Sequence, residues 1–160
     1  MDTFNSTAKD ARPLRLLVPI NANDDSRWGI RYALRRQREG LAVEVILLNI
    51  GEPITQWEVL RFRTEQEISH FQEESAQCFI GEATAALMTA NIPCRGVFRQ
   101  GDVVFSILDS AEEFACDEIV MPQPMQGLSS CFSRNIVRAA MRGRRDIPIV
   151  AVNGEGIPVA

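Results

Sequence analysis

The sequence predicts an α/β protein of three layers, in which a five-stranded parallel sheet lies between two layers of helices. Short apolar runs alternate along the chain with longer segments whose apolar residues recur at helical spacing. The runs are almost continuously apolar, as are strands that are covered on both faces. Parallel neighbours need crossover connections, and the helical segments supply them. At 160 residues the chain suffices for one domain with a full hydrophobic core.

The first half of the chain supplies two strands and two helices. Residues 14–20 (LRLLVPI) are the first apolar run, and NANDDS after it provides turn and cap residues for a helix that reaches Arg38. Gly40 ends this helix, and residues 42–50 (AVEVILLNI) predict the second strand. Residues 64–90 contain no proline and predict a long helix, with a stripe formed by Ala83, Ala86, Leu87 and Ala90.

The third strand and the helix after it follow a clear stop signal. Asn91 and Pro93 end the long helix, and residues 94–99 predict a strand. Gly101 and Asp102 then open a helix whose apolar residues share one face, namely Val104, Ile107, Leu108, Ala111 and Ala115.

The last part of the chain predicts two strands around one helix. Residues 118–121 form the fourth strand, and residues 147–152 (IPIVAV) form the fifth. Between them Ser133 caps a helix that Gly143 ends, with Ile136, Val137, Ala140 and Met141 as its apolar residues.

Composition narrows the class of protein. The net charge of -4 argues against a dedicated nucleic-acid binder, because neutralising phosphates needs a basic surface. No run of about 18 apolar residues is present to span a membrane. We expect a cytoplasmic protein with a flexible arm at residues 1–12, one domain at residues 13–153 and a tail at residues 154–160. Its widely spaced cysteines predict reduced thiols, at Cys78, Cys94, Cys116 and Cys131.

The order of these segments resembles the universal stress protein family. Residues 14–50 are similar to the family's first strand ending in "VPVD", a helix with an "AL..A" pattern, and a second strand ending near "LLHV". Residues 101–121 resemble "G...I...A...ADLIVMG", and residues 144–152 (RRDIPIVAV) resemble the closing "CPVLVV". Residues 52–92 match only in length and character. The resemblance implies an adenine-nucleotide alpha hydrolase-like (Rossmann-like) fold and a homodimer through the last strand, Ile147 to Val152.

Part of that family binds ATP, and the resemblance implies where its site would lie. The family uses an aspartate at the end of the first strand and a loop of the form G-xx-G-x9-G-S/T. Here Asn21 stands at the aspartate, and Pro122, Met125, Asn135 and Ile136 stand at the three glycines and the Ser/Thr. Glycine lets the backbone approach phosphates closely, whereas proline has no N–H to donate. We therefore predict a closed or repurposed nucleotide site.

A degenerate pocket of this kind would be lined by Pro19, Ile20, Asn21, Ile50, Met121, Ser133 and Asn135. Asn21 can still accept hydrogen bonds through its amide oxygen, and the helix that begins near Arg134 still offers N-terminal N–H groups to an anion. We expect no cofactor, with ATP or AMP as the alternative.

Arginines recur on two helical faces. Arg134, Arg138 and Arg142 are spaced by four residues, and Arg31, Arg35 and Arg38 lie on the first helix. Each set is either a solvated face or a docking patch for an acidic partner or nucleic acid.

Catalysis has little support in the sequence. His70 is the only histidine, and we expect it on a helix surface. Cys131 lies in the ligand loop, where we expect an inert thiol. Asp24 and Asp25 are explained by a helix cap.

The sequence therefore predicts a dimeric, non-enzymatic stress-response or regulatory protein that is not a typical ATP binder. The alternatives are an ATP or AMP binder with slow hydrolysis, and a partner-docking module. The fifth strand would leave an open edge, which either a second copy or the tail NGEGIPVA could cover.

Overall fold

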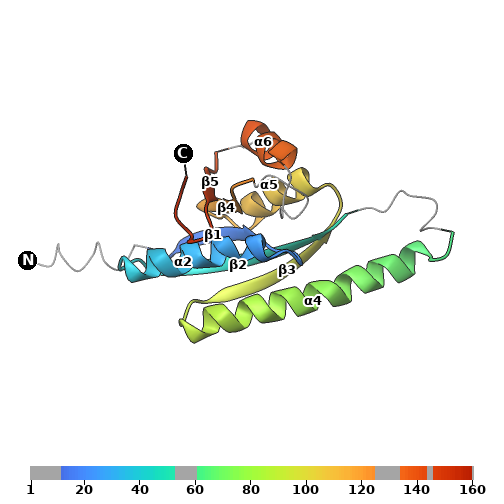
Figure 1. Ribbon diagram of the computed structural model, residues 1–160, viewed down its shortest axis with the longest axis horizontal. Coiled ribbons are helices and arrows are strands. Elements are labelled where there is room, and N and C mark those ends of the chain that lie inside the picture. Colours follow the sequence, from blue (N-terminus) through green and yellow to red (C-terminus); the bar gives the residue numbers. More distant parts are fainter. Residues whose placement is uncertain (1–11, 53–60, 125–133, 144–145, 160) are drawn as a thin grey trace, which may run out of the picture.

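The computed structural model describes residues 12–52, 61–124, 134–143 and 146–159. Within these residues the predicted three-layer α/β fold is confirmed (Figure 1). The sheet is parallel throughout, in the order β3-β2-β1-β4-β5. Its strands are β1 (Leu14–Pro19), β2 (Val43–Gly51), β3 (Cys94–Gln100), β4 (Glu118–Pro122) and β5 (Ile149–Val152). The helices are η1 (Asp24–Arg27), α2 (Trp28–Arg38), α4 (Glu65–Thr89), α5 (Val103–Glu113) and α6 (Arg134–Gly143).

Two hydrophobic cores lie on the two faces of the sheet. Alternate residues of β1 point to opposite faces. Leu16 and Val18 therefore pack with α2 and α4, whereas Leu17 packs with α5 and α6. Because both faces are covered, β1 is apolar along most of its length rather than alternating.

Side-chain caps begin two of the helices. The Thr64 hydroxyl oxygen accepts from the Glu67 N–H at 3.1 Å, before α4. Asp102 accepts from the Phe105 N–H at 2.8 Å, before α5, as its position after Gly101 predicted.

Two residues do not lie where the sequence pattern placed them. Ala86 is exposed, because the buried stripe of α4 runs through Ala76, Ala83 and Leu87 and leaves Ala86 at its margin. Ala115 lies beyond the end of α5, with a φ of 51°. The Cys116 N–H donates to the Ala111 carbonyl at 2.9 Å, so Ala115 is the left-handed residue of a helix C-cap and not part of the apolar face.

The fifth strand begins two residues later than the sequence predicted. Ile147 and Pro148 precede β5, which starts at Ile149. Pro148 cannot donate to the ladder, although its carbonyl accepts from the Ile119 N–H at 3.0 Å.

The C-terminal segment folds back onto the domain. The Val159 N–H donates to the Ala151 carbonyl, and the Asn153 N–H donates to the Ile157 carbonyl, both at 2.9 Å. Residues 153–159, here named the tail hairpin, therefore lie along the outer edge of β5 near its carboxyl end, with an antiparallel bridge between Val152 and Pro158.

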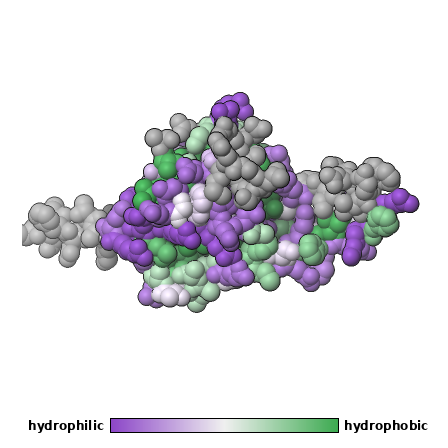
Figure 2. Space-filling model, viewed as in Figure 1, coloured by the Kyte–Doolittle hydropathy of each residue, from purple (hydrophilic) through white to green (hydrophobic). Residues whose placement is uncertain are grey.

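Helix α2 holds this tail hairpin in place. Arg31 donates to the Gly154 carbonyl, and Arg35 donates to the Glu155 carbonyl at 3.0 Å. Figure 2 shows hydrophilic residues gathered over α2. Two of the four arginines on this helix, Arg31 and Arg35, thus bind the chain's own backbone, which neither sequence-based interpretation of that face anticipated. Gly156 has a φ of 76° and lies against the α2 backbone.

Among the described residues, no helix combines the length and the apolar character needed to cross a membrane.

Candidate functional site

The sheet order creates a switch point between β1 and β4. From β1 the chain proceeds outward through β2 and β3, and it then returns to the other side of β1 to build β4 and β5. Ligands of such sheets bind beyond the carboxyl ends of the strands at this point. Here β1 and β4 are paired only at Leu16–Glu118 and Leu17–Ile119.

Two prolines explain why this pairing stops. The Ile20 N–H donates to the Leu48 carbonyl, so Ile20 faces β2 and Pro19 faces β4. The Gln123 N–H donates to the Val152 carbonyl, so Gln123 faces β5 and Pro122 faces β1. If the register continued, the next two donors between β1 and β4 would be residues 19 and 122. Neither proline has an N–H, so the ladder cannot continue, and neither strand presents a donor to the switch point there.

The loop after β1 is closed by its own side chains. The Asn21 Oδ1 accepts from the Asn23 N–H at 2.8 Å, which is an Asx turn. The buried Ser26 hydroxyl lies 2.7 Å from the Asn23 carbonyl oxygen and 3.2 Å from that of Asn21, and it donates to them. The side-chain oxygen of Asn21, the residue that stands at the family's aspartate, is therefore engaged within its own loop.

The end of β2 is tied to the end of β1 by Asn49. This side chain is only 6% exposed, and its Nδ2 donates to the Ile20 carbonyl at 2.8 Å. Ile50, the sequence-predicted lining residue on this strand, is half-buried and packs against the core under α5 and α6. The sequence placed the end of this strand at the predicted pocket through Ile50. It did not show that Asn49 donates a hydrogen bond to Ile20, because that bond depends on the pairing of β1 with β2.

The apolar site residues belong to the cores rather than to an open cleft. Ile20 is 3% exposed and packs on the α2 and α4 side. Met121 is fully buried and packs on the α5 and α6 side. Pro19 is buried and ends β1. Ser133 and Met125 fall outside the described residues, as does the side chain of Asn135.

The described residues offer no catalytic constellation. His70 is exposed on α4, as predicted, with its Nε2 at 3.1 Å from a Glu74 carboxylate oxygen. Burial raises the pKa of the Cys116 thiol to about 11, which keeps it protonated near neutral pH. No group of three or more His, Cys, Asp and Glu residues in the described part of the chain could hold a metal ion. Cys131 falls outside the described residues.

Solved structures share this arrangement. A universal stress protein from Archaeoglobus fulgidus has a TM-score of 0.71 and 15% identity, over 91% of this chain and 52% of that chain. A universal stress protein in complex with cAMP has a TM-score of 0.63 and 15% identity, over 89% of this chain and 98% of that chain. The chain has the universal stress protein fold.

A third structure with this fold carries a nucleotide. The universal stress protein family protein from Arabidopsis thaliana, with AMP bound, has a TM-score of 0.57 and 12% identity, over 88% of this chain and 92% of that chain. No protein-family model and no curated protein matches this chain in sequence. At these identities the universal stress protein fold is shared, and the function depends on the residues at the switch point.

Proposed function

We propose that this protein is a stress-response or regulatory member of the universal stress protein family, which acts without catalysis and does not bind ATP at the family's site. The closed switch point supports this proposal most strongly. Pro122 removes a donor where the family has a glycine, and Asn21, which stands at the family's aspartate, is engaged in its own turn.

The expected loss of affinity follows from the missing donors. A phosphate cradle depends on several backbone N–H groups that point at one anion. Pro122 and Pro124 cannot supply two of them. Each hydrogen bond to a charged acceptor contributes about 1.5 to 3 kcal/mol, so losing two weakens ATP binding by roughly two to four powers of ten.

Calorimetry tests this proposal. Purified protein is first examined by mass spectrometry for copurified nucleotide and then titrated with MgATP. We expect no saturable heat up to millimolar MgATP. The Arabidopsis thaliana protein, whose structure carries AMP, serves as a positive control with AMP under the same conditions. Micromolar binding of MgATP to this chain would overturn the proposal.

AMP binding is the second candidate function. Two of the structures with this fold hold cAMP or AMP, and these ligands have fewer phosphate groups than ATP. A ligand with one phosphate depends least on the loop donors that the prolines remove. The same calorimeter therefore runs an AMP titration. Saturable AMP binding without ATP binding would favour this candidate, in which slow hydrolysis of ATP has no part.

A partner-docking role has a surface of its own. Arg138 and Arg142 are exposed on α6 and have no ion-pair partner among the described residues. Together with Arg134, which precedes them at the same four-residue spacing in the sequence, they are named the arginine face, and an acidic protein segment is the partner that suits its charge. A polyglutamate peptide provides the test. An affinity for this peptide that falls steeply with salt concentration, and that is lower in Arg138→Gln, would support this role. Equal affinity of Arg138→Gln and the unsubstituted protein would contradict it.

Homodimerisation through the segment Ile147 to Val152 remains a proposal. The tail hairpin lies on the outer edge of β5 at Ala151 and Val152. A second copy that pairs with this edge would have to displace the tail hairpin first. Light scattering at micromolar concentration measures the molar mass of a chain that is shortened to residue 153, in which the tail hairpin no longer covers this edge. A monomeric mass for this shortened chain would contradict the proposal.

A further inference from the structure

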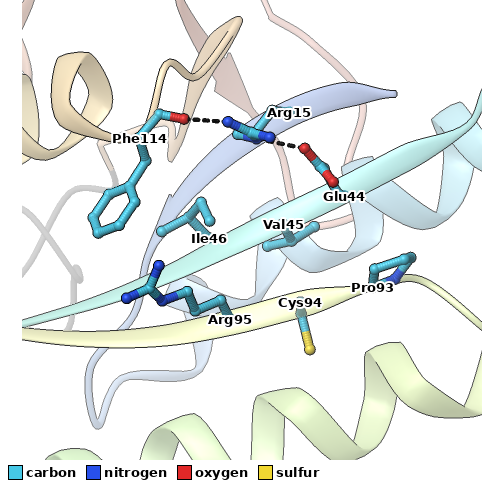
Figure 3. A pocket seen from close by; sticks show the side chains of 8 residues that line it. All are labelled: Arg15, Glu44, Val45, Ile46, Pro93, Cys94, Arg95 and Phe114. Carbon is cyan, nitrogen blue, oxygen red and sulfur yellow. Dashed lines mark hydrogen bonds and ion pairs between the residues drawn. The ribbon is translucent and has the colours of Figure 1, made fainter. Parts of the chain in front are cut away.

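A hollow lies at the amino-terminal ends of β1, β2 and β3, beside the end of α5 (Figure 3). The switch point lies at the opposite, carboxyl-terminal ends of the strands. The volume of the hollow is about 280 Å³. Ligands at the switch point lie beyond the carboxyl ends of the strands, so this hollow is separate from the nucleotide site. Its lining includes Arg15, Glu44, Ile46, Pro93, Arg95 and Phe114, from segments that are far apart in the sequence.

One pair of charges in the hollow is already neutralised. The Arg15 Nε donates to the Glu44 carboxylate, and the Arg15 Nη1 donates to the Phe114 carbonyl at 2.6 Å. Figure 3 shows this pair on one side of Ile46, with Arg95 and the Phe114 ring on the other side. Arg15 is therefore held by the protein's own groups and fixes the end of α5 over the strands.

Arg95 has no such partner. Its guanidinium carbon lies 5.1 Å from the centroid of the Phe114 ring, and in the described part of the chain it makes no hydrogen bond and no ion pair. The nearby carboxylates are engaged elsewhere, since Glu44 pairs with Arg15 and Glu113 receives Arg99 at 3.1 Å on both oxygens. Among the residues that the structure describes, Arg95 thus has no counterion, and it lies beside an aromatic ring.

This geometry prepares Arg95 for a carboxylate. A guanidinium that lies over an aromatic ring uses its face in that contact, and the N–H donors in its plane stay available. Those donors match the two oxygens of a carboxylate as a fork. Because the ring holds the guanidinium in place, less side-chain freedom is lost on binding.

We propose that the hollow binds a small organic monocarboxylate with an apolar body, such as an aromatic acid. Arg95 receives the carboxylate, and Ile46, Pro93 and the Phe114 ring contact the body. The hollow lies just below the 300 to 1,000 Å³ that is typical of pockets for drug-sized ligands, so the ligand is small. The Glu44 carboxylate in the wall repels a second negative charge, which disfavours a phosphate dianion.

An NMR titration of the isotope-labelled full-length chain with sodium benzoate tests this site, and sodium acetate and inorganic phosphate serve as comparison probes. We expect saturable shifts of the Ile46, Arg95 and Phe114 amide signals with benzoate. Acetate lacks the apolar body, and phosphate carries too much charge, so both should bind more weakly than benzoate.

A pair of arginine variants provides the control. Arg95→Gln removes the fork from an exposed position and should weaken benzoate binding by about tenfold or more. Arg63→Gln makes the same change of charge just before α4, where Arg63 lies 3.8 Å from Glu67, and it should leave the affinity unchanged. The amide spectrum of each variant verifies that the fold is kept.

Three results would overturn the proposal. The first is the absence of saturable shifts at these residues up to millimolar benzoate. The second is equal affinity of Arg95→Gln and the unsubstituted protein. The third is tighter binding of phosphate than of benzoate, which would show that the hollow selects charge and not an apolar acid.

Discussion

Replacing Gly156 by alanine is predicted to release the tail hairpin from the domain. Gly156 has a φ of 76°, and a Cβ built there would lie 2.6 Å from both the Arg31 carbonyl carbon and the Tyr32 nitrogen. These are backbone atoms of α2, so no side-chain rotation can relieve the contacts. The left-handed backbone adds about 1 to 2 kcal/mol for any residue other than glycine.

The size of the effect follows from what holds the tail hairpin. Its contacts include the hydrogen bonds from Arg31, Arg35 and the Val159 N–H, and each contributes about 0.5 to 1.5 kcal/mol net. The strain of Gly156→Ala is of the same order, so the tail hairpin should undock while β5 stays paired with β4. The free energy of unfolding then falls by no more than the free energy of docking the tail hairpin.

Amide hydrogen exchange measures this release. We expect the Val159 amide to exchange at least about tenfold faster in Gly156→Ala, which corresponds to a loss of about 1.4 kcal/mol. Gly154→Ala is the matched control, because the atoms nearest to its added Cβ belong to the Trp28 ring and lie at 3.5 Å or more, which is ordinary van der Waals contact. Unchanged exchange of the Val159 amide in Gly156→Ala, or equally fast exchange in Gly154→Ala, would show that the fit of Gly156 against α2 does not hold the tail hairpin in place.

Three further predictions concern stability, pH and thiol reactivity. Asn49→Ala leaves the buried Ile20 carbonyl without its donor. Urea unfolding should show a free energy of unfolding that is lower by about 1 to 3 kcal/mol. An unchanged free energy of unfolding would contradict the role of Asn49 as a link between β1 and β2. Burial, together with a hydrogen bond to a carboxylate, raises the pKa of Tyr32 to about 12 from its ordinary value of 10. The folded state therefore holds this proton more tightly, so the stabilisation is present below pH 10 and is lost as the pH rises through 12. Tyr32→Phe should lack this part of the alkaline loss in urea unfolding, and an identical pH profile would contradict the assignment. Burial also raises the pKa of Cys116 to about 11, so iodoacetamide at neutral pH should modify the exposed Cys78 well before Cys116. Mass spectrometry measures the order of modification, and earlier modification of Cys116 would contradict this prediction.

Local sequence signals predicted the elements of the fold well, because each one is carried by neighbouring residues. Apolar runs marked the strands, and Asp102 marked the start of α5. Ala115 misled the pattern, since an alanine at helical spacing does not reveal that the helix has already ended in a left-handed cap. Ala86 misled it in the same way, because small residues fit both the buried stripe and its exposed margin.

The candidate sites were less accessible to sequence reasoning, because they depend on register and tertiary contact. Pro122 was noticed as a missing glycine, but its joint effect with Pro19 appears only when the pairing of β1 with β4 is known. The hollow around Arg95 was not predicted, since Arg15, Glu44 and Phe114 meet it from distant segments. The tail hairpin depends on the fit of Gly156 against α2, which no local pattern reveals.

The most direct test of the closed switch point is an NMR titration of the full-length chain with MgATP, read at the amides of Ile20, Asn23 and Gln123. These amides already donate to Leu48, Asn21 and Val152, respectively, so we expect no saturable shift at any of them up to millimolar MgATP. Saturable shifts at these amides at micromolar MgATP would show that the loop after β1 opens to receive the nucleotide, and that the switch point is not closed.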